Sequence, residues 1–234
     1  MKKYSFAILS SFIFLSSLAQ DKTPIRFYKN AKVGYKDESG KVIVEPTYQA
    51  GSDFYNGYAL VLKNNKRGFI NNTSNVVIDF IYDDASVFTQ LGFARVTQGG
   101  KSGYINKAGK VIIPLEFDFA DDFNKDGLAR VSKNSKFGYI NPKGVEVIKL
   151  QYENAHNFTE EVAAVQNADK KWGYINSKNV YTIAATFDEA APFYNGLARV
   201  RKDNKAYYID LKGNWVKDEK KPEEEEMEKL ERKH

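Results

Sequence analysis

The sequence predicts an all-β protein, built as a tandem array of about six three-stranded antiparallel units of about 35 residues each. Three observations support this fold class. A glycine followed by an aromatic residue recurs in steps of 34 or 35 residues. Short runs of aromatic and β-branched residues, which favour strands, surround each glycine. Asn, Asp and Gly stand between the runs, as tight turns require. We expect an open curved array or a propeller-like ring, followed by a short charged C-terminal tail.

The first 19 residues are predicted to be a signal peptide. Lys2 and Lys3 precede an apolar run from Phe6 to Leu18, and small residues stand before Gln20 at the positions that a signal peptidase requires. The run is shorter than the roughly 20 apolar residues of a transmembrane helix. No polar face interrupts it, which argues against a buried helix. We therefore expect an exported mature chain from Gln20, periplasmic or extracellular, with no transmembrane segment. The absence of cysteine excludes a lipoprotein anchor.

Each unit contains a turn that follows the repeated glycine. Gly103–Ile105 and Val111–Ile113 are expected to be strands, joined by a turn over residues 106–109. Asn or Asp stands at the start of each turn, and its side chain accepts hydrogen bonds within the turn. Glycine three residues later supplies a positive φ. Asn179 replaces this glycine at small cost, whereas Ser74 fits poorly, so we expect the second turn to differ and to use Asn75.

A third strand is expected upstream of each glycine, as in Leu128–Val131. The segment that links one unit to the next, such as Tyr82–Phe88, is predicted to form a helical turn or an irregular loop. This segment also repeats. It begins with an aromatic residue, which is Tyr48, Tyr82, Phe117, Tyr152 or Phe187. Three residues later stands a small residue, which is Gly51, Ala85, Ala120, Ala155 or Ala190. Six residues after the aromatic stands a phenylalanine, which is Phe54, Phe88, Phe123, Phe158 or Phe193.

A unit of about 35 residues cannot bury a core alone, so the units must stack on their neighbours. Ile25–Phe27 supplies the first strand of the first unit, and Tyr207–Val216 supplies the last strands of the sixth. No unit is split between the two chain ends, so the interlocking closure of a β-propeller is not visible. The repeat domain is predicted to span residues 20–216, and the tail residues 217–234.

The pattern resembles the WG-repeat family of bacterial exported proteins. Leu128–Val131, Phe137–Asn141 and Phe187–Phe193 carry the resemblance. The chain departs from the family at its name-giving pair, which is kept only as Trp172-Gly173. At the tryptophan position the other units have Val33, Arg67, Ser102, Phe137 and Ala206. The resemblance implies a repetitive β architecture in an exported protein, and it transfers no catalytic residue.

The composition leaves little material for catalysis. The chain has no cysteine and two histidines, which excludes thiolate metal sites and a cysteine nucleophile. Carboxylates recur at Asp83, Asp118, Glu153 and Asp188. They could serve glycoside hydrolysis or Ca²⁺ binding, but a residue needed by every unit is better explained by a turn hydrogen bond. We predict no catalytic, cofactor-binding or metal-binding residue, and no cofactor.

Basic and aromatic residues raise the question of binding. Arg95, Arg130 and Arg199 could form a basic stripe with lysines of the following turns, which include Lys133, Lys136, Lys170 and Lys171. Removal of Lys2 and Lys3 lowers the net charge from +5 to +3, too little to favour nucleic acid. The sequence does not exclude an anionic envelope polymer as a ligand.

The repeated aromatics after the glycines are expected to pack in the core rather than stack on sugars. These residues are Tyr35, Phe69, Tyr104, Tyr139, Tyr174 and Tyr208. We expect His156 to take no part in metal binding or catalysis, and Gly99-Gly100 to be a simple turn between strands.

The tail from Asp218 to His234 has no aromatic residue and contains the acidic block Glu223–Glu226. Such a composition cannot bury a core, so we expect a solvated or helical segment that acts as a solubilising cap or docks a partner.

These observations predict a non-enzymatic exported binding or scaffold module for an envelope protein or a polysaccharide. The alternative is a carbohydrate-active hydrolase with a pair of carboxylates on the repeat loops, for which Asp122 is a test position. A purely structural spacer is the third hypothesis.

Overall fold

The computed structural model describes residues 23–219. The predicted signal peptide, and the tail beyond Glu219, lie outside the described residues. Within residues 23–219 the chain consists of strands, turns and irregular segments, with no helix. This confirms the all-β class.

The described strands form six antiparallel sheets that follow one another along the chain. The first sheet has three strands, β1 (Ile25–Lys29), β2 (Lys32–Lys36) and β3 (Val42–Tyr48). The other five have four strands each, which are β4 (Ala50–Gly51), β5 (Tyr58–Lys63), β6 (Lys66–Asn71) and β7 (Val76–Tyr82); β8 (Asp84–Ala85), β9 (Phe93–Gln98), β10 (Lys101–Asn106) and β11 (Val111–Phe117); β12 (Phe119–Ala120), β13 (Ala129–Lys133), β14 (Lys136–Ile140) and β15 (Glu146–Tyr152); β16 (Asn154–Ala155), β17 (Val162–Gln166), β18 (Trp172–Asn176) and β19 (Tyr181–Phe187); and β20 (Glu189–Ala190), β21 (Leu197–Lys202), β22 (Lys205–Asp210) and β23 (Trp215–Asp218).

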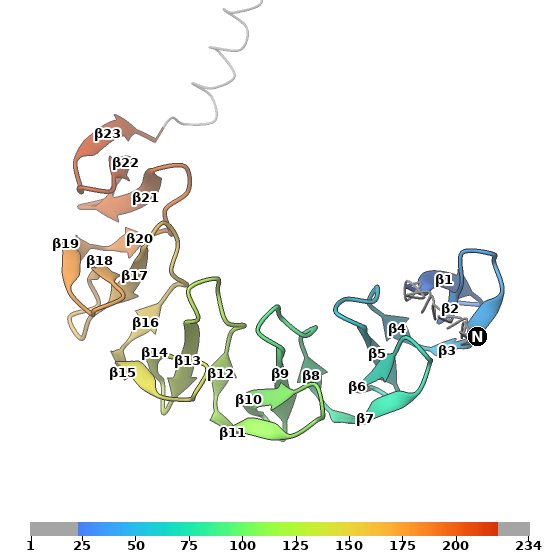
Figure 1. The fold of residues 1–234 in the computed structure, drawn as a ribbon. Coiled ribbons are helices and arrows are strands. Elements are labelled where there is room, and N and C mark those ends of the chain that lie inside the picture. The colour runs from blue at the N-terminus through green and yellow to red at the C-terminus, as the bar shows by residue number, and fades with distance from the viewer. Residues whose placement is uncertain (1–22, 220–234) are drawn as a thin grey trace, which may run out of the picture.

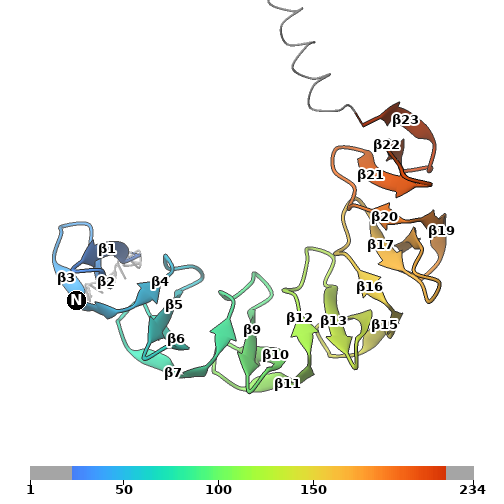
Figure 2. The same ribbon diagram turned by 180° about the vertical axis from the view of Figure 1, so that it is seen from behind.

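The six sheets form an open arc (Figure 1). Both views place the first and last sheets at opposite ends of the arc, so the array does not close into a ring (Figures 1 and 2). Strands β7, β11, β15 and β19 lie along the convex side, and the two-residue strands β4, β8, β12, β16 and β20 lie toward the concave side. We call the concave side the inner edge. Of the two predicted alternatives, the open array is confirmed.

The linking segment differs from its prediction, because it contributes a fourth strand to the sheet. In Tyr82–Phe88, β8 pairs with β9 through Asp84↔Thr97 and Ala85↔Val96. The helical turn is wrong, and the irregular loop holds only for residues 86–88. One residue, Asp83, separates the last strand of one sheet from the first strand of the next. This short link holds adjacent sheets close together, which a helical turn would prevent.

The repeated glycine lies opposite a bulge in the outer strand. Arg67 on β6 pairs with Tyr82 on β7, and Phe69 pairs with Ile78. Two residue steps along β6 therefore correspond to four along β7, and the additional residues of β7 form the bulge. A Cβ atom on Gly68 would lie 2.6 Å from the Ile78 carbonyl oxygen. The same close approach recurs at the glycines of the other units, which include Gly34, Gly103, Gly138 and Gly173. Only glycine permits the bulged strand to approach this closely.

The predicted turns form as expected, with one correction. Asn106 Oδ1 accepts hydrogen bonds from the backbone N–H groups of Ala108 and Lys110, both at 3.0 Å. Asn71 does the same for Thr73 and Asn75, at 3.1 and 2.9 Å. The expectation that Asn75 replaces Ser74 was wrong, because Ser74 itself has a φ of 69°. The hydrogen bonds of the turn hold the serine in the left-handed region.

Aromatic side chains form the contacts between neighbouring sheets. The Tyr174 ring lies 4.8 Å from the Phe193 ring of the next sheet, and the Tyr174 hydroxyl donates to the Ala191 carbonyl at 2.7 Å. Equivalent ring pairs join Tyr35 to Phe54, Phe69 to Phe88, Tyr104 to Phe123 and Tyr139 to Phe158. The first five repeated aromatics are at most 1% exposed, which confirms their predicted place in the core. Tyr208, in the last sheet, is half-buried.

The last sheet extends past the predicted boundary at Val216. Strand β23 runs to Asp218, and Glu219 binds the Arg199 guanidinium through contacts of 2.6 and 2.8 Å. The Glu219 backbone N–H also donates to the Ala206 carbonyl at 3.1 Å. These contacts attach the first residues of the predicted tail to the repeat domain.

Candidate binding surface on the inner edge

Side chains from three positions of the unit meet on the inner edge between neighbouring sheets. The position opposite the repeated aromatic is arginine in four of the six units, as Arg26, Arg95, Arg130 and Arg199, and it changes to Leu60 and Ala164 in the other two. The other two positions vary more from unit to unit, and positions that vary are where a repeat protein carries its specificity. The residue before the glycine is Val33, Arg67, Ser102, Phe137, Trp172 or Ala206. The first residue of the short strand is Ala50, Asp84, Phe119, Asn154 or Glu189.

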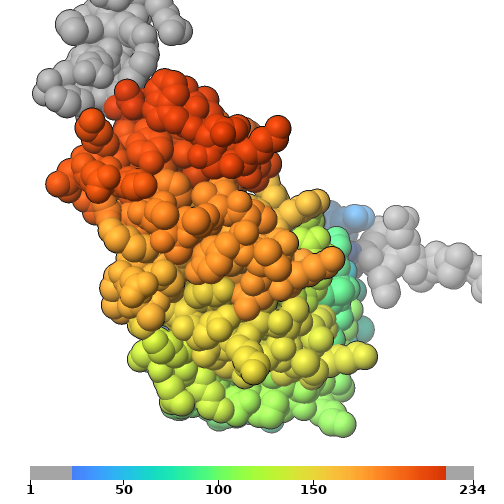
Figure 3. Space-filling model, turned by 90° about the vertical axis from the view of Figure 1, so that its left-hand side faces the viewer, coloured from blue at the N-terminus to red at the C-terminus, as the bar shows by residue number. Residues whose placement is uncertain are grey.

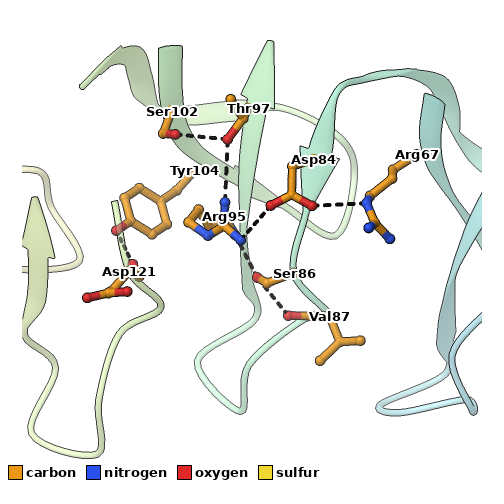
Figure 4. Close-up of polar contacts among 9 residues, drawn as sticks. All are labelled: Arg67, Asp84, Ser86, Val87, Arg95, Thr97, Ser102, Tyr104 and Asp121. Atoms are coloured by element: carbon orange, nitrogen blue, oxygen red, sulfur yellow. Dashed lines mark hydrogen bonds and ion pairs between the residues drawn. The ribbon is translucent and has the colours of Figure 1, made fainter. Parts of the chain in front are cut away.

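Between the second and third sheets the inner edge carries a charged ladder (Figure 4). Asp84 lies between two arginines, 3.0 Å from Arg67 Nε and 2.9 Å from Arg95 Nη2. Arg95 Nη1 also lies 3.4 Å from Thr97 Oγ1, and the Thr97 hydroxyl lies 2.8 Å from the Ser102 hydroxyl. The ladder therefore presents guanidinium, carboxylate and hydroxyl groups next to one another.

Arg130 is held between two aromatic rings in the fourth sheet. Its guanidinium carbon lies 4.8 Å from the centre of the Phe119 ring and 5.8 Å from that of Phe137, within cation–π range. Arg130 Nε donates to Asp121 at 2.8 Å, and the guanidinium also donates to the Ala155 carbonyl. Phe119 is 36% exposed, so part of an aromatic ring faces solvent beside a fixed cation.

His156 and Trp172 continue the aromatic part of the inner edge. Their rings are stacked, with centres 5.1 Å apart and planes 26° from parallel. Burial lowers the pKa of His156, and the charge of Arg130 lowers it further, so the imidazole is neutral at pH 7. Both rings line a hollow of about 300 Å³ together with Pro192, Glu189 and Arg199. His156 thus packs as a neutral aromatic residue.

The inner edge is rich in charge but has no net charge. The arginines predicted to form a basic stripe are paired with carboxylates instead, since Arg95 binds Asp84, Arg130 binds Asp121, and Arg199 binds Glu219 and Glu189. Six arginines, Lys101 and seven carboxylates lie along this edge, and the charges of these groups sum to zero. They are Arg26, Arg67, Arg95, Arg130, Arg199, Arg201 and Lys101, and Asp53, Asp84, Asp118, Asp121, Asp122, Glu189 and Glu219.

Three of the four repeated carboxylates, Asp83, Asp118 and Asp188, accept a backbone hydrogen bond from a turn, as predicted, and Glu153 binds Lys170 of its turn instead. Asp118 accepts the Asn134 backbone N–H at 2.7 Å and Lys101 Nζ at 2.5 Å. It therefore ties the hairpin turn of its own sheet to a lysine of the preceding sheet. The same link recurs between Asp83 and Lys66, Glu153 and Lys136, and Asp188 and Lys171. We call these four pairs the lysine–carboxylate clamps. In each clamp the lysine hydrogen bond lowers the pKa of the carboxyl group.

One hollow on the inner edge bears on the hydrolase hypothesis. It measures about 450 Å³ and is lined by four carboxylates, with Arg95, Thr97 and Ser102 beside them. These carboxylates are Asp84, Asp118, Asp121 and Asp122. Asp84, Asp118 and Asp121 are each bound to a basic residue, and the lysine contact lowers the pKa of Asp118. A general acid needs the opposite shift. Asp122 is exposed and forms no ion pair among residues 23–219.

No cluster of three or more His, Asp or Glu side chains in residues 23–219 could hold a metal ion. Over the same residues, no helix has the length and hydropathy to cross a membrane.

Sequence reasoning overlooked several inner-edge residues. Arg67 was noted only as a substitute for tryptophan, and Phe119 and Glu219 were not singled out. Arg67 and Phe119 differ from the residues at the same positions of the other units. A comparison of the units position by position, with attention to the differences, would have found Arg67 and Phe119. Glu219 lies beyond the last full repeat and needed the structure.

Comparisons with known proteins agree with this architecture. The family model described as WG containing repeat matches five tandem segments, residues 34–66, 68–101, 103–137, 137–171 and 172–205. The first match starts in the second strand of the three-stranded first sheet, and the other four start in the third strand of a four-stranded sheet. Each match ends in the next sheet, so the sequence repeat and the sheet are offset. No curated protein matches the chain.

Solved structures align with the chain at low sequence identity. A eukaryotic initiation factor aligns with a TM-score of 0.54 and 10% identity, over 85% of this chain and 62% of that one. The chain thus spans less than two thirds of that protein's length. Hsv2 from Kluyveromyces lactis aligns with a TM-score of 0.46 and 12% identity, over 82% and 72% of the two chains. BamB from Moraxella catarrhalis aligns with a TM-score of 0.45 and 9% identity, over 87% and 74%. At these identities the first likeness concerns the fold alone.

Proposed function

The chain belongs to the WG-containing repeat family, and from this premise we propose that it is a non-enzymatic, exported binding module that holds a surface polysaccharide of low net charge along its inner edge. The observation that carries the proposal is the gathering of arginine, carboxylate and aromatic side chains on the concave side of an open arc. Extended concave surfaces are the usual binding surfaces of repeat proteins.

The balance of charge favours a neutral polymer over an anionic one. The six arginines and Lys101 would attract a polyanion, but seven carboxylates lie beside them and cancel the long-range field. Fixed pairs of guanidinium and carboxylate groups offer donors and acceptors side by side, which suits the adjacent hydroxyls of a sugar. The partly exposed Phe119 ring offers an apolar face for a sugar ring.

The repeat itself supplies substitutions that the scaffold tolerates. Alanine stands in the second sheet at the position of Phe119, as Ala50, and in the fifth sheet at the position of Arg130, as Ala164. The double variant Phe119→Ala, Arg130→Ala should therefore fold. The matched control is Tyr181→Val on the convex strand β19, since valine starts the equivalent strands at Val42, Val76 and Val111.

The test measures the binding of the full chain to a panel of soluble neutral polysaccharides and their acidic counterparts. We expect binding to at least one neutral polymer, about ten-fold weaker in the double variant and unchanged in the Tyr181→Val control. Preference for the acidic polymers, with strong dependence on salt, would contradict the proposal, and so would equal binding by both variants. Failure to bind any polysaccharide would favour an envelope protein as the partner.

Asp122 gives the hydrolase hypothesis one supporting observation. Its exposed carboxylate lies in the 450 Å³ hollow without an ion pair among the described residues. If the bound polysaccharide is shortened during the assay, and Asp122→Asn abolishes the shortening while binding persists, the chain is an enzyme. An intact polymer after prolonged incubation supports the binding module.

Export is a separate part of the proposal and rests on residues 1–19. When the full chain is expressed in a bacterium, we expect the protein outside the cytoplasm to begin at Gln20, as read by N-terminal sequencing. A chain that keeps Met1 and stays in the cytoplasm would contradict export without affecting the binding test.

A further inference from the structure

Two positions of the unit meet wherever one sheet packs on the next. The second residue after the repeated glycine position faces the preceding sheet, and the tenth faces the following sheet. Ile105 and Ile78, for example, are buried in the same cluster between the second and third sheets. The second position is isoleucine in units two to six, as Ile70, Ile105, Ile140, Ile175 and Ile209, and each is fully buried. The tenth is Val44, Ile78, Ile113, Ile148 and Ile183 in units one to five.

Both positions change to lysine where the neighbouring sheet is missing. The second position of the first unit is Lys36, on the outward face of the first sheet. The tenth position of the last unit is Lys217, on the outward face of the last sheet. Within residues 23–219 no further sheet packs on either face. Figure 3 shows the last sheet, in red, stacked on the sheet before it at one end of the molecule.

The rest of these two faces keeps an apolar character. Ile25 stands where the inner units have buried alanine, and it is 46% exposed. Phe27 and Tyr208 add aromatic rings that are half-buried. The ammonium group of Lys36 lies 5.8 Å from the Phe27 ring centre, and that of Lys217 lies 5.0 Å from the Tyr208 ring centre. Each lysine therefore sits over the aromatic surface that another sheet would cover.

We infer that Lys36 and Lys217 are end caps, which prevent the first sheet of one copy of this chain from stacking on the last sheet of another copy. If two copies joined end to end in the geometry of the inner contacts, Lys217 of one copy and Lys36 of the other would enter the same apolar cluster. Two unpaired ammonium groups would then be buried side by side, which costs both desolvation and repulsion. The two faces thus correspond to faces that the inner sheets bury against one another, and charge keeps them apart. Such caps give a tandem array a defined length.

The test replaces both caps with the residue that the inner units use. The double variant Lys36→Ile, Lys217→Ile of the full chain is compared with the wild type by sedimentation velocity over a wide range of concentration. We expect the wild type to sediment as a monomer. The double variant should form end-to-end oligomers, with a self-association constant at least about 100-fold higher, because two isoleucine side chains become buried at each joint.

The matched control is the double variant Lys110→Ile, Lys149→Ile. These exposed lysines belong to the third and fourth sheets, Lys110 just before β11 and Lys149 on β15, away from the two terminal faces, and they form no ion pair among residues 23–219. The control has the same change in charge and hydrophobicity and should stay monomeric. End-to-end association of the wild type would overturn the inference. So would a double cap variant that remains monomeric, or a control that associates as strongly as the cap variant.

Discussion

Single residues decide how closely two strands of a sheet approach one another. At Gly138 an added Cβ atom would lie 2.5 Å from the Ile148 carbonyl oxygen and 2.8 Å from the Leu150 nitrogen. Backbone atoms cannot move away as a flexible side chain can, so a larger residue must separate β14 from the bulged β15. The repeat preserves this glycine because the bulge requires it, whereas the tryptophan before it is replaced in five of the six units without loss of the strand.

Gly138→Val should lower the free energy of unfolding by about 2–4 kcal/mol. Its comparison is Lys136→Ala, two residues earlier on the same strand, which removes only a surface ion pair with Glu153 and should cost less than about 1 kcal/mol. Urea unfolding of both variants measures the difference. Equal unfolding midpoints would show that the glycine is not needed for the close approach.

Ser74 is the one member of its turn position that is neither glycine nor asparagine. It holds a φ of 69°, and its hydroxyl oxygen is buried without a hydrogen-bond partner. Ser74→Gly should therefore stabilise the protein by about 1 kcal/mol, through relief of the left-handed strain and of the unpaired hydroxyl. Thermal unfolding measures this gain, with Asn179→Gly as the milder comparison. A lower midpoint for Ser74→Gly would contradict the assignment of strain to this turn.

At the scale of elements, the lysine–carboxylate clamps connect each hairpin turn to the sheet before it. The carboxyl pKa values of Asp83, Asp118 and Asp188 lie below 3.8, and that of Glu153 lies below 4.5, because a lysine hydrogen bond favours the charged form. A lowered pKa in the folded state gives stability that is present above the unfolded-state pKa. This stability is lost as the pH falls through the lower, folded-state value.

Stability should therefore fall as the pH is lowered from 4.5 through 3.8 and below. A variant with all four clamp carboxylates changed to Asn or Gln should show a flatter decline over this range, measured by urea unfolding at each pH. Some dependence remains, since hydrogen bonds also lower the pKa values of Asp37, Asp210 and Glu219. An unchanged pH profile in the variant would exclude the clamps as a source of stability.

Most elements of the fold could be predicted from the sequence, because each repeated residue has the same local role in every unit. The Asn and Asp turns, the strands and the buried aromatics follow from such local chemistry. The short strands such as β8 could not be predicted, since two residues carry no periodic pattern and pair only because the link between sheets is short. The turn at Ser74 was misjudged because the hydrogen bonds of the turn outweighed the preference of a single residue.

At the scale of the whole molecule, the open shape follows from packing between sheets rather than from any residue pattern. The rotation from one sheet to the next is small and accumulates along the array, so the repeat predicts stacking but leaves closure undetermined. The inner edge could be predicted in part. The arginine at the position of Arg130 recurs and was expected in a basic stripe, whereas Arg67 and Phe119 each occur in one unit and have no repeated pattern. The structure shows the partners of these two residues, since Arg67 binds Asp84 and Phe119 lies against Arg130.

The central claim is that six sheets form an open arc whose inner edge is accessible to a long polymer. Small-angle X-ray scattering of the full chain tests it most directly. An open arc predicts a radius of gyration clearly above the roughly 17 Å of a compact chain of this length, and a distance distribution with a long tail. A radius of gyration at the compact value, with the symmetric distribution of a closed ring, would contradict the claim and remove the inner edge as a binding surface for a long polymer.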